Sequence, residues 1–225
     1  MNVTARAQPP KAGRLRPFEF PPVTRENLAN GLGLLHARHG ELPLVTLSLV
    51  IDAGGTEEPE TRAGLAAMTA NALASGTSRR SADQIAWAIE SLGIHLEAHA
   101  GWDAAYVRMT VPTHRLDEAA DLFAEVVRDP VFPDDEITRL REQQLAGLLQ
   151  RRKQPGTLAN DAAARTIFFE DVPWSRPLVG KPDTVQALSR DAVAGFHHAR
   201  YSPRGAALVV VGSIDRAGAR ALAER

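Results

Sequence analysis

Alternation of hydrophobic and polar residues marks several predicted strands along the chain. In residues 44–53, every second position from Val45 to Ile51 is apolar, which is the period of a strand with one buried face. An Asn-Gly pair at 30–31 separates two apolar segments and predicts a hairpin within residues 28–39. Further strands are predicted at residues 94–100 and 105–111, which alternate around a Gly-Trp-Asp turn, and in the apolar run 206–211.

Apolar residues at helical spacing predict the elements between these strands. Residues 64–77 are rich in alanine and predict a short, largely buried helix that Gly76 ends. Ser81 and Gln84 have the spacing of a capping box at the start of the next helix, and Gly93 ends that helix. Residues 57–61 are predicted as a polar loop. Other helices are predicted at residues 114–128, 134–153, 155–169 and 189–201, and a last one begins at 216.

The order of these elements predicts the fold class. Strands, two helices, a strand pair, further helices and a final strand are typical of an α+β fold, in which helices pack on one face of a mostly antiparallel sheet. No linker interrupts residues 23–225, so we expect them to form one domain. Residues 1–22 are rich in proline and basic residues and are predicted to be a flexible lead.

Composition excludes several classes of function. The net charge of -1 offers no electrostatic basis for binding nucleic acid, and the absence of cysteine excludes a thiol nucleophile or a Cys-ligated metal. No apolar run approaches the roughly 18 residues of a membrane span. The first residues also lack the apolar core of a signal peptide. We therefore expect a cytoplasmic protein, or a periplasmic one if the N-terminus is incomplete.

A series of short motifs occurs in a fixed order along the chain. The motifs are Leu28-Ala-Asn-Gly-Leu, Ala53-Gly-Gly-Thr-Glu-Glu-Pro, Ala63-Gly-Leu-Ala, Ser91-Leu-Gly-Ile, Pro173-Trp-Ser-Arg-Pro-Leu-Val-Gly180, Tyr201-Ser-Pro and Val209-Val-Val-Gly-Ser-Ile-Asp215. Together they resemble one enzyme family, the M16 (pitrilysin-like) metallopeptidases, which include mitochondrial processing peptidases and respiratory-chain core proteins. The resemblance implies the LuxS/MPP-like metallohydrolase fold. Family subunits have two similar domains in tandem, so this chain is expected to be a truncated one that covers the first.

The chemistry of the family is absent from the matching positions. Active members carry H-x-x-E-H on a helix, where two His bind zinc, the Glu acts as general base, and a distant Glu completes the site. Here the motif positions hold Ala67, Ala70 and Asn71, and the distant position falls at Ala146-Gly147, with Gly147 as its degenerate counterpart. A zinc site needs about three protein ligands. We therefore expect no catalytic residue, no metal ligand and no cofactor in this chain.

The resemblance implies a role for such a chain. Several members of the family work as pairs, in which one subunit carries zinc and the other is degenerate. The expected function is that of a zinc-free, non-catalytic partner that helps to form a peptide-binding chamber, with zinc and H-x-x-E-H in a homologous partner subunit. Two alternatives stay open: a purely structural subunit resembling the core proteins, and an independent enzyme that uses other residues.

One predicted strand is a candidate contact for substrate. His95, Glu97 and His99 alternate and share a face, but the outer two would lie about 13 Å apart, too far for one metal ion. The family's counterpart of this strand adds an extended substrate at its edge, which implies a contact at Glu97, Ala98 and His99. An ordinary polar strand face is the other interpretation.

Two further features have simpler interpretations. His197 and His198 are adjacent on a helix and point about 100° apart, so they cannot chelate one ion together, and surface or capping roles are expected. Trp102, at the tip of a strand pair, is predicted to serve in packing or in contact with a partner.

Overall fold

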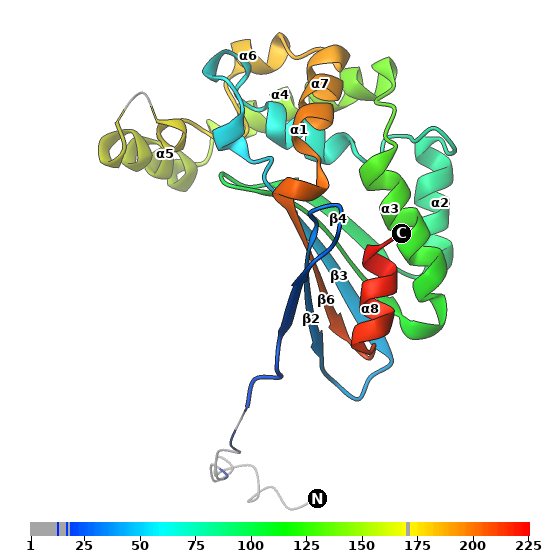
Figure 1. The fold of residues 1–225 in the computed structure, drawn as a ribbon. Coiled ribbons are helices and arrows are strands. Elements are labelled where there is room, and N and C mark those ends of the chain that lie inside the picture. The colour runs from blue at the N-terminus through cyan, green and yellow to red at the C-terminus, as the bar shows by residue number, and fades with distance from the viewer. Residues whose placement is uncertain (1–12, 14–16, 18, 170–171) are drawn as a thin grey trace, which may run out of the picture.

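The computed structural model describes residues 13, 17, 19–169 and 172–225, so most of the predicted lead at 1–22 lies outside the described residues. The described strands form one six-stranded sheet in the order β1-β2-β6-β3-β5-β4 (Figure 1). β2 and β6 run parallel and the other neighbours pair antiparallel, as the sequence predicts. The strands are β1 (Thr24–Asn27), β2 (Gly33–Arg38), β3 (Leu44–Ile51), β4 (His95–Ala100), β5 (Ala105–Pro112) and β6 (Ala206–Gly212).

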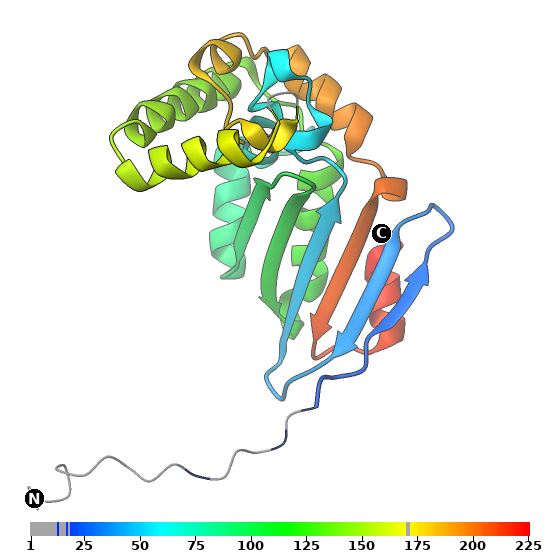
Figure 2. The same ribbon diagram turned by 90° about the vertical axis from the view of Figure 1, so that its left-hand side faces the viewer.

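The helices lie in two groups. α2, α3 and α8 cover one face of the sheet, whereas α1 and α4 to α7 gather beyond one end of it (Figure 1). Figure 2 looks onto the opposite face, where the described strands are not covered by helices. The helices are α1 (Leu65–Ala72), α2 (Ala82–Leu92), α3 (Leu116–Arg128), α4 (Asp134–Arg151), α5 (Pro155–Ile167), α6 (Pro182–Gln186), α7 (Arg190–Arg200) and α8 (Arg216–Ala223). Each described helix is too short or too polar to cross a membrane.

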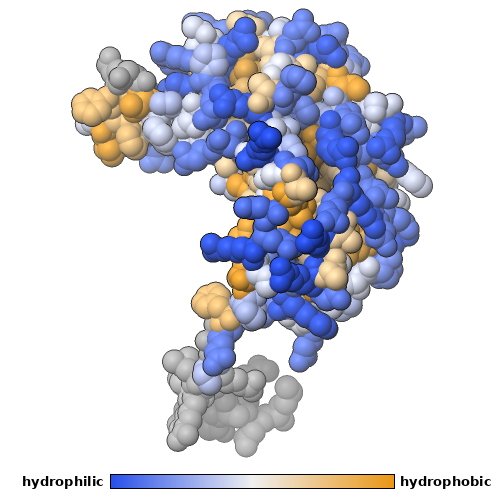
Figure 3. Space-filling view, viewed as in Figure 1, coloured by the Kyte–Doolittle hydropathy of each residue, from blue (hydrophilic) through white to orange (hydrophobic). Residues whose placement is uncertain are grey.

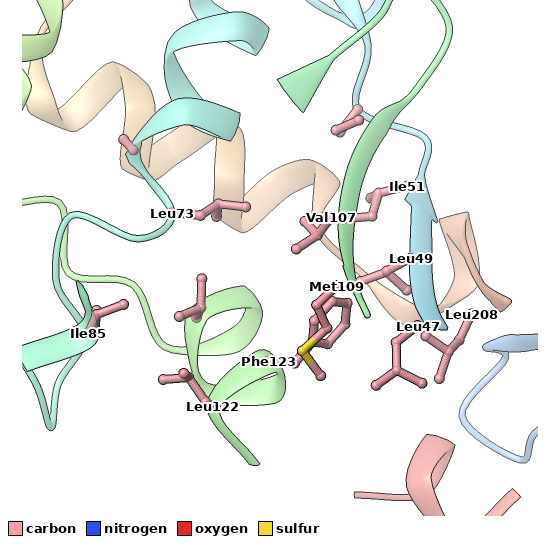
Figure 4. Packing of buried hydrophobic residues seen from close by; sticks show 14 of the residues in the cluster. Leu47, Leu49, Ile51, Leu73, Ile85, Val107, Met109, Leu122, Phe123 and Leu208 are labelled. Carbon is pink, nitrogen blue, oxygen red and sulfur yellow. The ribbon is translucent and has the colours of Figure 1, made fainter. Parts of the chain in front are cut away.

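The core lies between the sheet and the helices that cover it. Alternate residues of β3 are buried from Val45 to Ile51, as the sequence pattern predicts. Leu47, Leu49 and Met109 of the sheet pack toward Phe123 of α3 (Figure 4). Because each fully buried aliphatic or aromatic side chain contributes about 1.5–3 kcal/mol, this layer supplies much of the stability of the fold.

Helix α5 differs from the others because none of its residues is buried. It projects from the group of helices beyond the end of the sheet, and hydrophobic residues gather at its far end (Figure 3). Ile167, the last residue of α5, is 74% exposed, and Phe169, two residues further along the chain, is 82% exposed. The surface is hollowed between this helix and the sheet, so α5 forms one side of an open concavity (Figure 3).

Most predicted boundaries agree with the structure, including the capping box of Ser81 with Gln84 and the left-handed Gly93 that ends α2. The predicted helix at 64–77 is wrong at its C-terminal end, because α1 stops at Ala72. The following residues instead form isolated bridges, Gly76 with Ser81 and Thr77 with Pro130. The short helix α6 falls in a region where the sequence predicted no helix.

A buried carboxylate holds the segment that follows α1. The side chain of Glu125 on α3 is 1% exposed and accepts a hydrogen bond of 2.5 Å from the Thr77 hydroxyl. It also forms an ion pair with Arg80, and Arg79 lies 3.9 Å away. Burial by itself would raise the pKa of Glu125, but Thr77 and Arg80 outweigh it and hold this pKa below its ordinary value.

The buried carboxylate of Glu125 predicts a pH-dependent contribution to stability. A carboxyl whose pKa is lowered on folding stabilises the protein above its ordinary pKa, and that stability is lost as pH falls through the folded-state pKa. We expect Glu125→Gln to lower the free energy of unfolding by about 2 kcal/mol near pH 7 and by less at acidic pH. Urea unfolding at a series of pH values between neutrality and acid measures both effects.

The matched control is Glu118→Gln, on an exposed site of the same helix. It should leave the pH dependence of unfolding unchanged. Parallel pH curves for wild type and Glu125→Gln would contradict the proposed role of the buried carboxylate.

Candidate functional site

A cavity of about 260 Å³ lies between α1, α4 and the segment that precedes α6. It brings together Ala67, Asn71 and Gly147, three of the four positions that the sequence identifies as degenerate. The fourth, Ala70, is fully buried and is not among the residues that line the cavity. The lining residues are Ala67, Met68, Asn71, Leu140, Gln143, Gln144, Gly147, Leu148, Arg151 and Val179.

The two helices present these positions in different ways. Ala67 and Asn71 are separated by one helical turn on α1, so both point into the same space. Asn71 is the exposed residue of an otherwise buried helix, and it lies at the mouth of the cavity. Gly147 is exposed on α4, and no atom lies within 4 Å of where its Cβ would be. The cavity therefore occupies the space that larger side chains would fill at these three positions.

The chemical groups of the cavity do not fit a zinc ion. None of its lining residues carries an imidazole or a carboxylate, and the polar ones are Asn71, Gln143, Gln144 and Arg151. Zinc sites use about three nitrogen, sulfur or carboxylate ligands, and amide and guanidinium groups do not supply them. Within the described ranges, no cluster of three or more His, Asp or Glu residues is placed to hold a metal.

The N-terminus of α1 is held by a buried acid that the sequence predicted only as part of a polar loop. Gly64 occupies the N-cap position with φ of 97°, and it has no side chain to accept hydrogen bonds. Glu58 replaces it. Its carboxylate accepts hydrogen bonds from the backbone N–H of Gly64 at 2.9 Å and of Ala66 at 2.8 Å. The missing cap residue at Gly64 is the signal that could have indicated a distant acceptor.

The motif at 173–180 secures the same helix end. Arg176 donates hydrogen bonds of 3.3 Å to the carbonyl oxygens of Gly55 and Glu58, and lies 3.8 Å from the Glu58 carboxylate. The Thr184 hydroxyl donates to the carbonyl oxygen of Ala63 at 2.8 Å. Burial raises the pKa of Glu58, although the two helix N–H groups and Arg176 oppose that rise.

The predicted substrate strand lies at the edge of the sheet. In the described part of the chain, β4 pairs with β5 alone, so Glu97, Ala98 and His99 are on an edge strand. Glu97 lies 3.5 Å from His95 and opposite Arg108 on the face without helices, and His99 stacks on Tyr106 at 5.1 Å. Helix α1 packs against this strand. The contact of Glu97, Ala98 and His99 with substrate stays a prediction.

The remaining candidates have structural roles. His197 is half-buried and has the expected capping role, because its Nε2–H donates at 2.9 Å to the carbonyl oxygen of Val127 in the last turn of α3, and His198 is exposed. It packs against Phe132 and Tyr201, and burial lowers its pKa. Trp102 is half-buried, and its backbone and ring approach the double glycine at 54–55 so closely that a Cβ on Gly54 would lie 2.1 Å from the Trp102 oxygen.

The sheet, the position of α1 and the cavity define a domain of the peptidase M16 type. Residues 37–177 match the sequence model of the insulinase family, peptidase family M16, and the chain belongs to this family. This confirms the resemblance predicted from the motifs.

Relatives agree with this assignment. The chain is 25% identical to an uncharacterized zinc protease of Rickettsia bellii over 84% of this chain and 45% of the relative. It is 23% identical to the mitochondrial-processing peptidase subunit beta of Lentinula edodes, over 88% of this chain and 42% of that protein. A crystal structure described as a peptidase M16 inactive domain from Pseudomonas fluorescens superposes with a TM-score of 0.85 at 27% identity, covering 90% of this chain and 49% of that one. The chain thus spans less than half the length of these relatives.

The role of Glu58 predicts a stability effect. Glu58→Ala leaves two helix N–H groups without their buried acceptor and Arg176 without its buried counter-ion, so we expect the free energy of unfolding to fall by about 3 kcal/mol. Chemical denaturation measures this change. The control is Glu60→Ala, two residues along the chain, whose side chain is 69% exposed and should matter little. Similar stability of the two variants would contradict the capping role.

The geometry of the cavity also predicts where a zinc site could be rebuilt. We expect Ala67→His, Asn71→His and Gly147→Glu together to bind one zinc ion, because all three positions line the same cavity. The matched control places the acid one residue earlier, at Ala146→Glu, outside the lining. It should bind zinc at least about tenfold more weakly, since it supplies only two ligands. Metal titration in competition with a chelator measures both affinities, and equal affinities would contradict the assignment of Gly147.

Proposed function

We propose that this chain is a zinc-free, non-catalytic partner subunit of a two-subunit M16-type peptidase, and that it helps to form a peptide-binding chamber. The observation that carries the proposal is the cavity lined by Ala67, Asn71 and Gly147. The family's helix is present there, and its three ligand positions hold no zinc ligands. Catalysis and zinc would then come from a homologous partner with an intact H-x-x-E-H.

Three observations support this role. The similar structure from Pseudomonas fluorescens is described as an inactive domain, and the Lentinula edodes relative is named a subunit. The surface is hollowed between α5 and the uncovered sheet face, which suits the wall of a chamber (Figure 3). The edge of β4 supports the contact with peptide, because the backbone of an edge strand can pair with any extended chain regardless of its sequence.

Co-expression tests the proposal. The chain is produced with an M16 homologue from the same organism that carries H-x-x-E-H, and peptidase activity is measured for each protein alone and for both together. We expect this chain alone to be inactive and the pair to be at least about tenfold more active than the homologue alone, since a completed chamber orients the substrate.

The control replaces the motif glutamate of the homologue by glutamine, which should abolish activity of the pair. A homologue that is fully active without this chain would overturn the proposal. If the two proteins form a complex but activity does not change, the chain is a structural subunit like the respiratory-chain core proteins.

A further inference from the structure

We propose that the cavity at Ala67, Asn71 and Gly147 is an anchor site for one uncharged, apolar side chain, of the size of leucine or phenylalanine, from the peptide that binds along β4. This inference rests on the proposed function and adds a side-chain preference to it. In place of a metal, the site would hold part of the substrate.

The volume of the cavity suits this occupant. At about 260 Å³ it is larger than the roughly 150 Å³ apolar cavity that is known to accommodate benzene. The volume is therefore sufficient for an isobutyl group or a phenyl ring. A methyl group would leave most of the space unfilled and would gain little dispersion energy from it.

The lining has the composition of a binding pocket. Its walls are aliphatic and come from Met68, Leu140, Leu148 and Val179. The exposed residues at its mouth include Asn71 and Gln143, whose amides are placed to pair with a peptide backbone. Predominantly apolar walls with a few polar groups are the usual arrangement of a site that binds an apolar group and orients it.

The charge at the cavity limits the occupant further. Arg151 lines the cavity, with a side chain that is 36% exposed, and it is paired at 3.0 Å with Asp161 on α5. Because this ion pair balances the charge of Arg151, neither a cationic nor an acidic side chain would find an unpaired partner in the lining. Burying such a charge without a partner is costly, so an uncharged side chain is the best match.

The position of the cavity connects it to the edge strand. Helix α1 carries Ala67 and Asn71 and packs against β4. The C-terminal end of β4 points toward the group of helices beyond the sheet (Figure 2). An extended peptide that pairs with β4 would pass close to α1, and its side chains would project alternately to either side. One of them would be directed to the helices.

Peptide binding to the purified full chain tests this inference. The probes are short blocked peptides of alanine and serine that differ in one central residue, which is Leu, Phe, Ala, Glu or Lys. We expect the Leu and Phe peptides to bind about tenfold or more tightly than the Ala peptide, and the Glu and Lys peptides to bind no more tightly than the Ala peptide. Methyl NMR locates the contact, because the Met68 methyl resonance should shift while that of Met109 in the sheet core should not.

Two glycine variants provide a matched pair. Gly147→Leu fills the cavity and should reduce the affinity for the Leu and Phe peptides about tenfold, to the level of the Ala peptide. Gly195→Leu changes a glycine inside α7 that also has no atom within 4 Å of its Cβ position, and it should leave every affinity unchanged. Both changes raise helix propensity, so both variants should fold.

The possible outcomes separate the anchor from the proposed function. If the peptides bind equally whatever their central residue, and Gly147→Leu has no effect, the anchor is wrong while peptide binding stands. A preference for the Glu peptide would also overturn it, because Arg151 would then select the ligand. If no peptide of the panel binds, both the anchor and the peptide contact in the proposed function are wrong.

Discussion

The buried carboxylate of Glu58 holds the start of α1, and the geometry of the candidate site depends on this contact. Its two oxygens accept the N–H groups of Gly64 and Ala66, and Arg176 lies beside it. Because the carboxylate contacts both the helix end and the motif at 173–180, it sets the direction in which α1 runs past α4. A shift of that helix would separate Asn71 from Gly147.

A second buried carboxylate secures the chain on the other side of α1. Glu125 binds Thr77 and Arg80 in the connection between α1 and α2. Glu58 thus holds the start of this short helix, Glu125 holds the connection that follows it, and buried alanines pack along its length. Isolated helices of this length are marginal in water, so tertiary packing and the contacts of these two carboxylates must stabilise α1.

This arrangement explains how an M16 domain keeps its fold without the zinc ligands. Where a structural metal holds a small domain together, losing the ligands unfolds it. Here the helix is positioned by carboxylates, by the 173–180 motif and by a hydrophobic core, and none of these involves positions 67, 71 or 147. The residue types at these positions can therefore differ without loss of those contacts, and the space between them is a cavity with aliphatic walls and Arg151 beside it.

Local features of the sequence determined much of this protein. The alternation in β3, the capping box at Ser81 and the spacing of Ala67 to Asn71 depend on neighbours within a few residues, so their periods can be read along the chain. Contacts between distant segments were decided only by the tertiary structure. β6 lies between β2 and β3, Glu58 caps a helix that lacks its own cap, and Gly147 rather than Ala146 faces α1. No local period encodes these, because each depends on which surfaces meet when the whole chain packs.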